Sequence, residues 1–299
     1  MSFLMGVSLL GVVTAVACAV PGVFVVLRRD AMMVDAISHA ALPGIAIGYI
    51  LTQDLSSPWL VIGAAIAGLV VVMAAEWLSH TGLLTGDAPI GLMFPALFSI
   101  GVLLITDHAS NVHLDEHTVL VGDLNLAAFK QFSLFGVTLG PQHLFVMLGV
   151  LLMNVIFIAV TFPRLTLTTL DPAFARTLGM SPLRLQMVFM LMVSLTGTAS
   201  FYASGAVLVI AQMIIPPAAA LLLSRTVTDM LWLSAGIAAM GALGGFWAAY
   251  VIDLPTSAAM AVFLGLILVV AVVISRVRRW MNQRGARHAE ALEEAAAAS

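Results

Sequence analysis

The sequence predicts an all-α polytopic membrane protein, a bundle of about nine (eight to nine) transmembrane helices with one short cytosolic helix. Of its 299 residues, 62% are hydrophobic and 9% charged, and the mean hydropathy is +1.10. Soluble domains have roughly 45–50% apolar and about 25% charged residues. The apolar residues form runs of about 20, the length that crosses a bilayer as a helix. A net charge of −3 with one lysine argues against nucleic-acid binding.

Nine apolar runs are the expected spans: 3–27, 32–52, 58–79, 88–106, 143–162, 184–203, 205–224, 230–252 and 256–275. The seventh contains Ile215-Pro216-Pro217. Because proline removes a backbone donor, we expect that span to be broken or re-entrant there. Residues 1–275 are predicted as one transmembrane domain. Residues 276–299 are predicted as a charged cytosolic tail that starts as a helix and is partly disordered toward its alanine-rich end.

The positive charges predict the orientation of these spans. If nine spans alternate, Lys130 falls on one side and the other eleven of the twelve Lys and Arg residues fall on the opposite side. Lys and Arg concentrate in cytoplasmic loops of membrane proteins. We therefore expect the N-terminus outside and the C-terminus in the cytoplasm.

Asp35 and His39 are the candidate ligands inside the membrane. On a helix, their i, i+4 spacing places carboxylate and imidazole on one face. His39 lies about 15 Å along the helix from Arg29, close to the bilayer midplane. Pro43 removes the donor for the carbonyl of His39, so a kink and a free oxygen are expected there. These ligand types suit Mn²⁺, Fe²⁺ or Zn²⁺ better than Mg²⁺ or Ca²⁺.

The same spacing allows other interpretations. An Asp–His hydrogen bond can hold two helices together without any ion, and Asp–His pairs also form proton relays. Glu76, one turn from the cytoplasmic end of its span, is more typical of an interfacial anchor than of a ligand.

The external segment 107–143 is rich in His and Asp. Its candidate residues for metal capture or for docking of a metal-loaded partner are His113, Asp115, His117 and Asp123. A solvated polar loop explains the composition equally well. Because the segment is long for an unstructured connection, we expect short helices within it.

The inner loop between the fifth and sixth spans predicts a short cytosolic helix. Asp171 suits the N-cap, Pro172 the first helical position and Gly179 the C-terminal cap. Phe174 and Leu178 then share one face. Apolar side chains in water favour a docking partner, although such a helix could also lie back on the rim of the bundle.

Five segments resemble, in order, landmarks of the ABC-3 family, the membrane permeases of ABC importers for manganese, zinc and iron: DAISHAALPG at 35–44, HLDEHTVLVGDLNLAAF at 113–129, TLDPAFARTLGM at 169–180, GAVLVIAQMIIPPAAALL at 205–222 and DLPTSAAM at 253–260. The resemblance covers about residues 5–275. Pro95 departs from the small polar residue expected at that position, which puts the path of its span in doubt.

The resemblance implies a multi-pass subunit of a bacterial cytoplasmic (inner) membrane importer. It implies a second permease subunit (an identical or a sister chain), two cytosolic ATPase subunits and an extracytoplasmic metal-binding protein. The transported ion would be divalent, with Mn²⁺ favoured over Zn²⁺ or Fe²⁺, and no cofactor would be permanently bound. Asp35 and His39 would be pathway ligands. The ATPase-coupling helix would comprise Asp171, Pro172, Phe174, Ala175, Arg176, Leu178 and Gly179.

The chain is not expected to be an enzyme. It contains no G-x-x-x-x-G-K-[ST] loop, so ATP would be hydrolysed by a separate subunit. The alternative function is a proton-coupled secondary transporter that uses Asp35 and His39 as a proton relay. Such transporters usually contain an internal repeat, and none is evident in this sequence.

Overall fold

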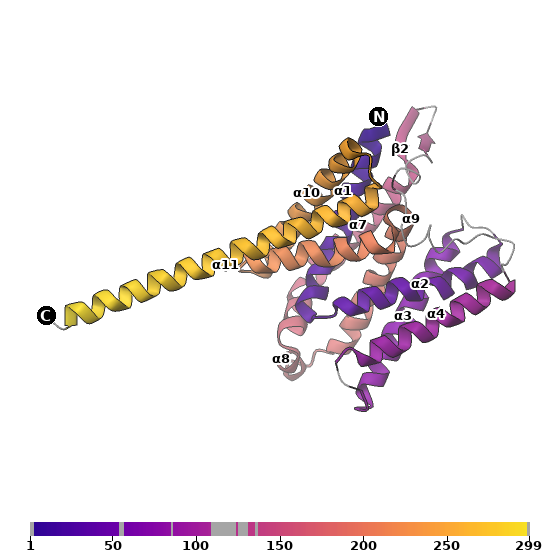
Figure 1. Cartoon of the computed structure of the whole chain (residues 1–299). Coiled ribbons are helices and arrows are strands. Elements are labelled where there is room, and N and C mark those ends of the chain that lie inside the picture. The colour runs from indigo at the N-terminus through magenta and orange to yellow at the C-terminus, as the bar shows by residue number, and fades with distance from the viewer. Residues whose placement is uncertain are drawn as a thin grey trace.

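A computed structural model of the chain describes residues 3–53, 57–84, 86–108, 124, 131–134 and 137–297. Nearly all of the described chain is helical (Figure 1). Its helices are α1 (Phe3–Arg28), α2 (Ala31–Thr52), α3 (Pro58–His80), α4 (Ala88–His108), α7 (Gln142–Leu170), α8 (Pro172–Thr177), α9 (Pro182–Leu223), α10 (Val227–Ile252) and α11 (Thr256–Ala297). Two strands, β1 (Gln131–Leu134) and β2 (Val137–Pro141), pair antiparallel.

The helices confirm the predicted number of spans. Within the described residues, eight segments are long and apolar enough to cross a membrane, and a ninth apolar helical segment, Ala88–Leu104, is shorter. The eight are Phe3–Arg28, Ala31–Thr52, Trp59–Ser79, Gln142–Leu170, Pro182–Phe201, Ala203–Leu223, Val227–Ile252 and Thr256–Arg278. Pro95 lies inside α4 without ending it, so the expected span is helical there.

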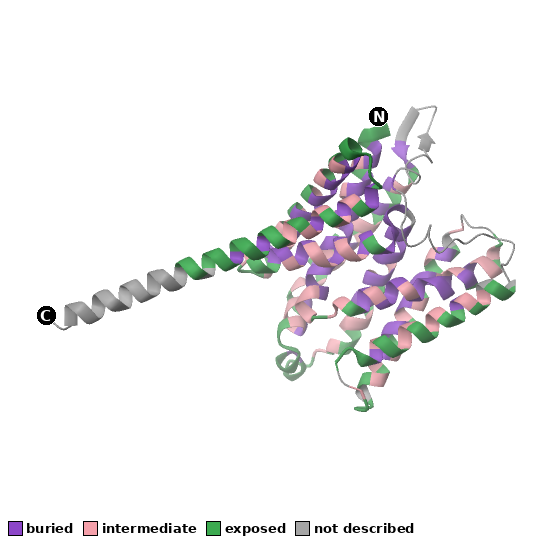
Figure 2. Ribbon diagram, viewed as in Figure 1, coloured by how far each residue is buried: buried purple, intermediate pink, exposed green. Residues whose placement is uncertain are grey.

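Helix α1 is central to the arrangement and packs against α7, α9 and α10 (Figure 1). Helices α2, α3 and α4 form a group beside it, and this group meets the remaining helices mainly through α9. The N-terminus and β2 lie at one end of the molecule, and α8 lies at the opposite end. Buried residues concentrate where α1, α9 and α2 meet, while the coloured part of α11 becomes more exposed toward Met281 (Figure 2).

Helix α9 is interrupted at Gly205, where the sixth and seventh expected spans were separated, and the further break expected at Ile215-Pro216-Pro217 was wrong. Gly205 has φ 72° and ψ 159°, a conformation that is essentially restricted to glycine. Pro216 and Pro217 lie inside the helix instead. Around these prolines α9 packs closely against α1. A Cβ added to Gly22 of α1 would lie 3.0 Å from the carbonyl carbon of Met213 and 3.1 Å from Cγ of Pro217.

The described part of 107–143 contains the β1–β2 hairpin. Residues 109–123, 125–130 and 135–136 of this segment lie outside the described residues, so the short helices expected in it stay a prediction. Helix α11 runs on into the predicted tail and is described as far as Ala297.

Buried polar side chains connect the helices of the core. Asn154 of α7 donates from Nδ2 to the carbonyl oxygen of Ala17 (3.1 Å) and to Oγ1 of Thr196 (2.8 Å). Its side chain therefore joins α7 to both α1 and α9. Cys18 of α1 lies 3.3 Å from Oγ of Ser200 in α9 and is fully buried, in agreement with the apolar run in which it lies.

Candidate metal pathway and inner coupling surface

Asp35 and His39 lie side by side on α2, as their spacing predicts. Nε2 of His39 is 3.6 Å from Oδ1 of Asp35, beyond the usual length of a hydrogen bond. Two ligands that each lie about 2.1 Å from one tetrahedral ion are about 3.4 Å apart. The pair therefore has a separation at which both groups could coordinate the same ion.

Two aromatic rings of α4 surround the imidazole. The centroid of the His39 ring is 5.3 Å from that of Phe94 and 6.1 Å from that of Phe98, which meets it edge-on. These contacts hold the ring against α4 while Nε2 remains directed at Asp35. Sequence reasoning did not identify Phe94 or Phe98, because only the fold brings α4 against this face of α2.

The pair is only partly covered within one chain. The side chain of His39 is 31% exposed and that of Asp35 is 43% exposed. They form an exposed stripe with Met32, one turn before Asp35, whereas the turn that follows His39, from Ala40 to Gly44, is buried. Ionisable groups at membrane depth are costly unless they face a protein interior or a water-filled cavity. The described residues leave this stripe partly uncovered.

The described residues offer too few ligands for a closed ion site at this position. In the described residues, no group of three or more His, Cys, Asp or Glu side chains is placed to hold a metal ion. Pro43, expected to kink α2 beside the pair, lies inside the helix; a Cβ on Gly101 of α4 would be 2.8 Å from its Cδ. The candidate capture residues His113, Asp115, His117 and Asp123 lie outside the described residues.

Helix α8 has the local structure that its sequence predicts. Oδ1 of Asp171 accepts a hydrogen bond from the backbone N–H of Phe174 (2.9 Å), and Pro172 occupies the first turn. Gly179 ends the helix with φ 75°, and the N–H of Met180 donates to the carbonyl of Ala175 (3.1 Å). These bonds satisfy backbone groups at both ends of a helix too short to be stable alone.

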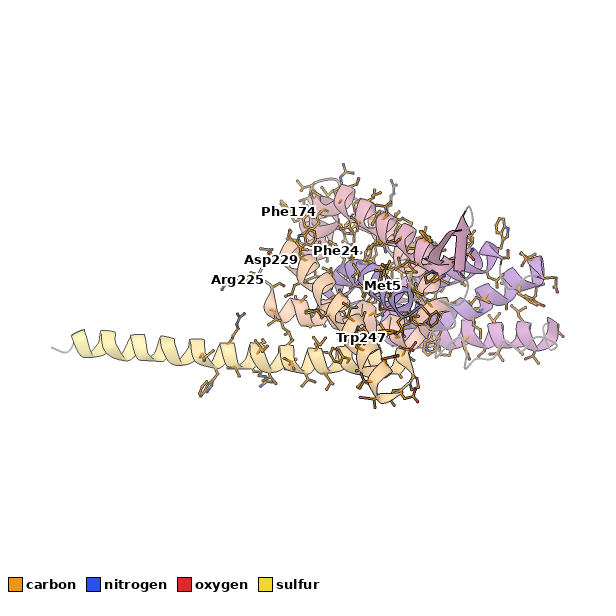
Figure 3. All side chains as sticks on the ribbon, turned by 90° about the horizontal axis from the view of Figure 1, so that it is seen from above. Met5, Phe24, Phe174, Arg225, Asp229 and Trp247 are labelled. Carbon is orange, nitrogen blue, oxygen red and sulfur yellow. The ribbon has the colours of Figure 1, made fainter. Side chains whose placement is uncertain are left out.

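The helix buries one side and exposes the other. Ala175 is fully buried, whereas Phe174 is 52% and Leu178 55% exposed. Arg176 is also exposed. Figure 3 shows Phe174 projecting at the rim of the bundle. Large apolar side chains at the exposed end of a membrane bundle, beside an arginine, form a surface suited to a protein partner.

The same end of the molecule contains a polar cluster that sequence reasoning missed. Nε of Arg28 donates to Oγ1 of Thr169 (3.0 Å), and Nε2 of Gln186 donates to Oε2 of Glu76 (3.0 Å). Burial raises the pKa of Asp30 to about 6; Arg28 opposes this rise, and Glu76 and Asp87 add to it. Glu76 was expected to be an interfacial anchor, and its bond to Gln186 shows that it also joins α3 to α9.

These features indicate the class of protein to which the chain belongs. A bundle of spanning helices with a carboxylate–imidazole pair inside its apolar zone is typical of membrane transport proteins. Comparison with known families then assigns the chain: residues 1–275 match the ABC 3 transport family, so the chain belongs to that family.

Curated relatives are membrane subunits of metal transport systems. The chain is 44% identical over 271 residues to the zinc transport system membrane protein TroD of Treponema pallidum (strain Nichols), covering 91% of this chain and 74% of TroD. It is 39% identical over 265 residues to the manganese transport system membrane protein MntD of Bacillus subtilis (strain 168), covering 89% and 90% of the two chains. The chain is thus a permease-type subunit related to zinc and manganese systems alike.

A solved structure has the same fold. PsaBC from Streptococcus pneumoniae, determined in complex with Fab, matches with a TM-score of 0.77 at 23% identity. The match covers 95% of this chain and 96% of that chain. The chain therefore shares its overall fold with this neighbour.

Proposed function

We propose that this chain is the permease subunit of an ABC importer that moves a divalent transition metal ion into the cytoplasm, with Asp35 and His39 as pathway ligands. The single observation that carries this proposal is their 3.6 Å separation on the exposed stripe of α2. Family membership and the metal-system relatives support the same function. The proton-coupled alternative receives no support from these comparisons.

A second permease subunit would cover the stripe and complete the ligand set. Two copies of α2 that meet across an axis would contribute two carboxylates and two imidazoles. Coordination by these few groups would be weak enough to release the ion, as a transport pathway requires. In this arrangement the half-exposed pair would face a protein-lined cavity and not lipid.

Helix α8 would be the coupling helix that contacts one of two cytosolic ATPase subunits. Its exposed Phe174, Leu178 and Arg176 would form the contact, with Asp171, Pro172, Ala175 and Gly179 fixing its shape. If α8 is cytoplasmic, the N-terminus would lie outside, because the two lie at opposite ends of the molecule (Figure 1). The C-terminal tail would then be cytoplasmic in a bacterial inner membrane, in agreement with the distribution of Lys and Arg.

The external segment would receive the ion from an extracytoplasmic metal-binding protein. His113, Asp115, His117 and Asp123 are the candidates for docking that protein or for capturing its ion. Manganese remains our first candidate cargo, with zinc and iron as the alternatives. No cofactor would be permanently bound.

The proposal is tested by reconstituting the chain with its ATPase and binding protein in liposomes and titrating Mn²⁺, Zn²⁺ and Fe²⁺ separately. We expect ATP-dependent uptake of one ion that requires the binding protein. Arg176→Glu should reduce the amount of ATPase that copurifies with the chain. Uptake driven by a pH gradient in the chain alone would instead support the secondary transporter.

A further inference from the structure

Two hydrogen bonds connect the chain segments on either side of α8 to the helices that lead to Asp35 and His39. The first joins Thr169, two residues before Asp171, to Arg28 at the end of α1. The second joins Gln186, in the second turn of α9, to Glu76 near the end of α3. Both bonds are partly buried, and their partners lie 141 and 110 residues apart in sequence.

The first bond leads directly into α2. Arg28 is the last residue of α1, and only Arg29 and Asp30 separate it from α2. Its guanidinium carbon also lies 5.2 Å from the centroid of the Phe189 ring in α9, which fixes the side chain from a second direction. A movement of α8 that carries the last turn of α7 with it would therefore pull on the start of the helix that holds Asp35.

The second bond reaches α2 through α3. Glu76 belongs to α3, and α3 touches α2 backbone to backbone: a Cβ on Gly63 would lie 2.5 Å from the carbonyl oxygen of Gly44. Gly44 follows His39 by five residues. Because helices are stiff along their axes, displacing Glu76 along its axis would shift the half of α2 that follows His39.

The two bonds thus act on α2 from both sides of the Asp35–His39 pair. Apolar packing between α2 and α9 is also present, with Val34, Ile37, Phe189 and Val193 in one buried cluster. Apolar contacts are non-directional and let helices slide, whereas a hydrogen bond specifies one partner atom. A third directional contact joins α9 to α3 nearer the pair, from Oγ of Ser194 to the carbonyl oxygen of Ala65 (3.0 Å). The Arg28–Thr169 and Glu76–Gln186 bonds are the directional contacts made by the segments that flank α8 directly.

We propose that the Arg28–Thr169 and Glu76–Gln186 hydrogen bonds are the tethers that couple movement of α8 to the Asp35–His39 pair, so that breaking either one uncouples ATP hydrolysis from ion movement. Arg28, Thr169, Glu76 and Gln186 are positioning residues and do not touch the ion. This inference rests on the proposed function, because it assumes that α8 receives the ATPase.

The Glu76–Gln186 tether is tested by a charge exchange in the full reconstituted complex. Gln186→Glu places two carboxylates together, and the double variant Glu76→Gln/Gln186→Glu restores one amide–carboxylate bond with the partners exchanged. We expect Gln186→Glu to lower the number of Mn²⁺ or Zn²⁺ ions moved per ATP hydrolysed by about tenfold while ATPase activity persists. The double variant should recover most of that ratio.

The Arg28–Thr169 tether is tested by Thr169→Val, which removes the hydroxyl and keeps the shape. The matched control is Thr161→Val in the same helix, because Oγ1 of Thr161 donates only within α7, to the carbonyl of Phe157 (2.6 Å). We expect Thr169→Val to lower ions per ATP and Thr161→Val to leave the ratio unchanged. Uptake and ATPase activity that fall in proportion would overturn the proposal, as would an unrecovered double variant.

A second readout separates this inference from the identity of the cargo. Met32 is 54% exposed in the single chain, one turn before Asp35, and the maleimide labelling of Met32→Cys in the complex reports how accessible this part of α2 is. The reactivity of this thiol should change when ATP is added, and Gln186→Glu should abolish the change. If this pattern is observed while none of the tested metals is transported, the proposed role of the tethers is supported and the proposed cargo is wrong. If ATP changes the reactivity of the thiol equally in Gln186→Glu, the proposed role of the tethers is overturned.

Discussion

Gly44 and Gly63 touch each other through their backbones, so that α2 and α3 approach as closely as two helices can. A Cβ on Gly63 would lie 2.5 Å from the carbonyl oxygen of Gly44, closer than real Cβ contacts come. Small residues allow such approach between membrane helices, where dispersion contacts replace the hydrophobic effect as the driving force. The contact holds the helix that carries His39 at a fixed distance from α3.

Gly44→Ala should therefore destabilise the protein. The added methyl group has no room and would force the two backbones apart, at a cost of about 1–3 kcal/mol. The matched control is Gly149→Ala in α7, where nothing lies within 4 Å of the added Cβ. Thermal unfolding in detergent should show a lowered Tm for Gly44→Ala only; equal Tm values for both variants would contradict the close contact.

Asp35→Asn should abolish metal uptake and leave assembly intact. The amide keeps the size of the side chain but loses the negative charge that would bind a cation, so we expect a loss of at least about tenfold in uptake. Asp253→Asn is the control, since Asp253 is exposed beyond the end of α10 in a left-handed conformation that asparagine accepts. Unchanged uptake in Asp35→Asn would exclude its role as a pathway ligand.

Asp171→Ala should weaken the attachment of the ATPase. The variant loses the bond from the N–H of Phe174, and loss of an N-cap costs about 1 kcal/mol, which a helix of six residues cannot absorb. We expect the amount of copurifying ATPase to fall several-fold. Asp171→Asn preserves the cap and should retain the ATPase; loss in both variants would point to the charge instead of the cap.

Asp30→Asn should stabilise the protein above pH 6 and have little effect near pH 4. The unfolded chain loses the proton of Asp30 near pH 4, whereas the folded chain keeps it until about pH 6, so the penalty develops between these values and is complete above pH 6. Removing the charge should raise the Tm by about 2–4 °C at pH 7.5. A Tm difference that is the same at pH 4.5 and pH 7.5 would show that the charge of Asp30 is not its source.

Features that depend on neighbouring residues could be predicted from the sequence. The spans follow from runs of apolar residues, the caps of α8 from residue types at fixed offsets, and the Asp35–His39 pair from its spacing on one helix. In each case a single helix supplies all the partners. The positions of these features along the chain are therefore correct to within a few residues, apart from α7, which continues to Leu170.

Features that need distant partners could not be predicted in this way. Proline suggested a break within the seventh span, but the helix continues through Pro216 and Pro217, where it packs against α1. The interruption lies at Gly205, at the boundary between the sixth and seventh expected spans. The rings of Phe94 and Phe98 and the Arg28–Thr169 bond likewise become visible only when the helices are placed together.

The bridging position of Asn154 has a consequence for biosynthesis. Its amide contacts Ala17, which is made 137 residues earlier, and Thr196, which is made 42 residues later. When α7 enters the bilayer, the carbonyl of Ala17 is already there, and the hydroxyl of Thr196 arrives only with the following span. The nascent chain must therefore hold a half-satisfied amide in the membrane until α9 is synthesised, so this amide is satisfied only shortly before α10 and α11 add their side chains to the core.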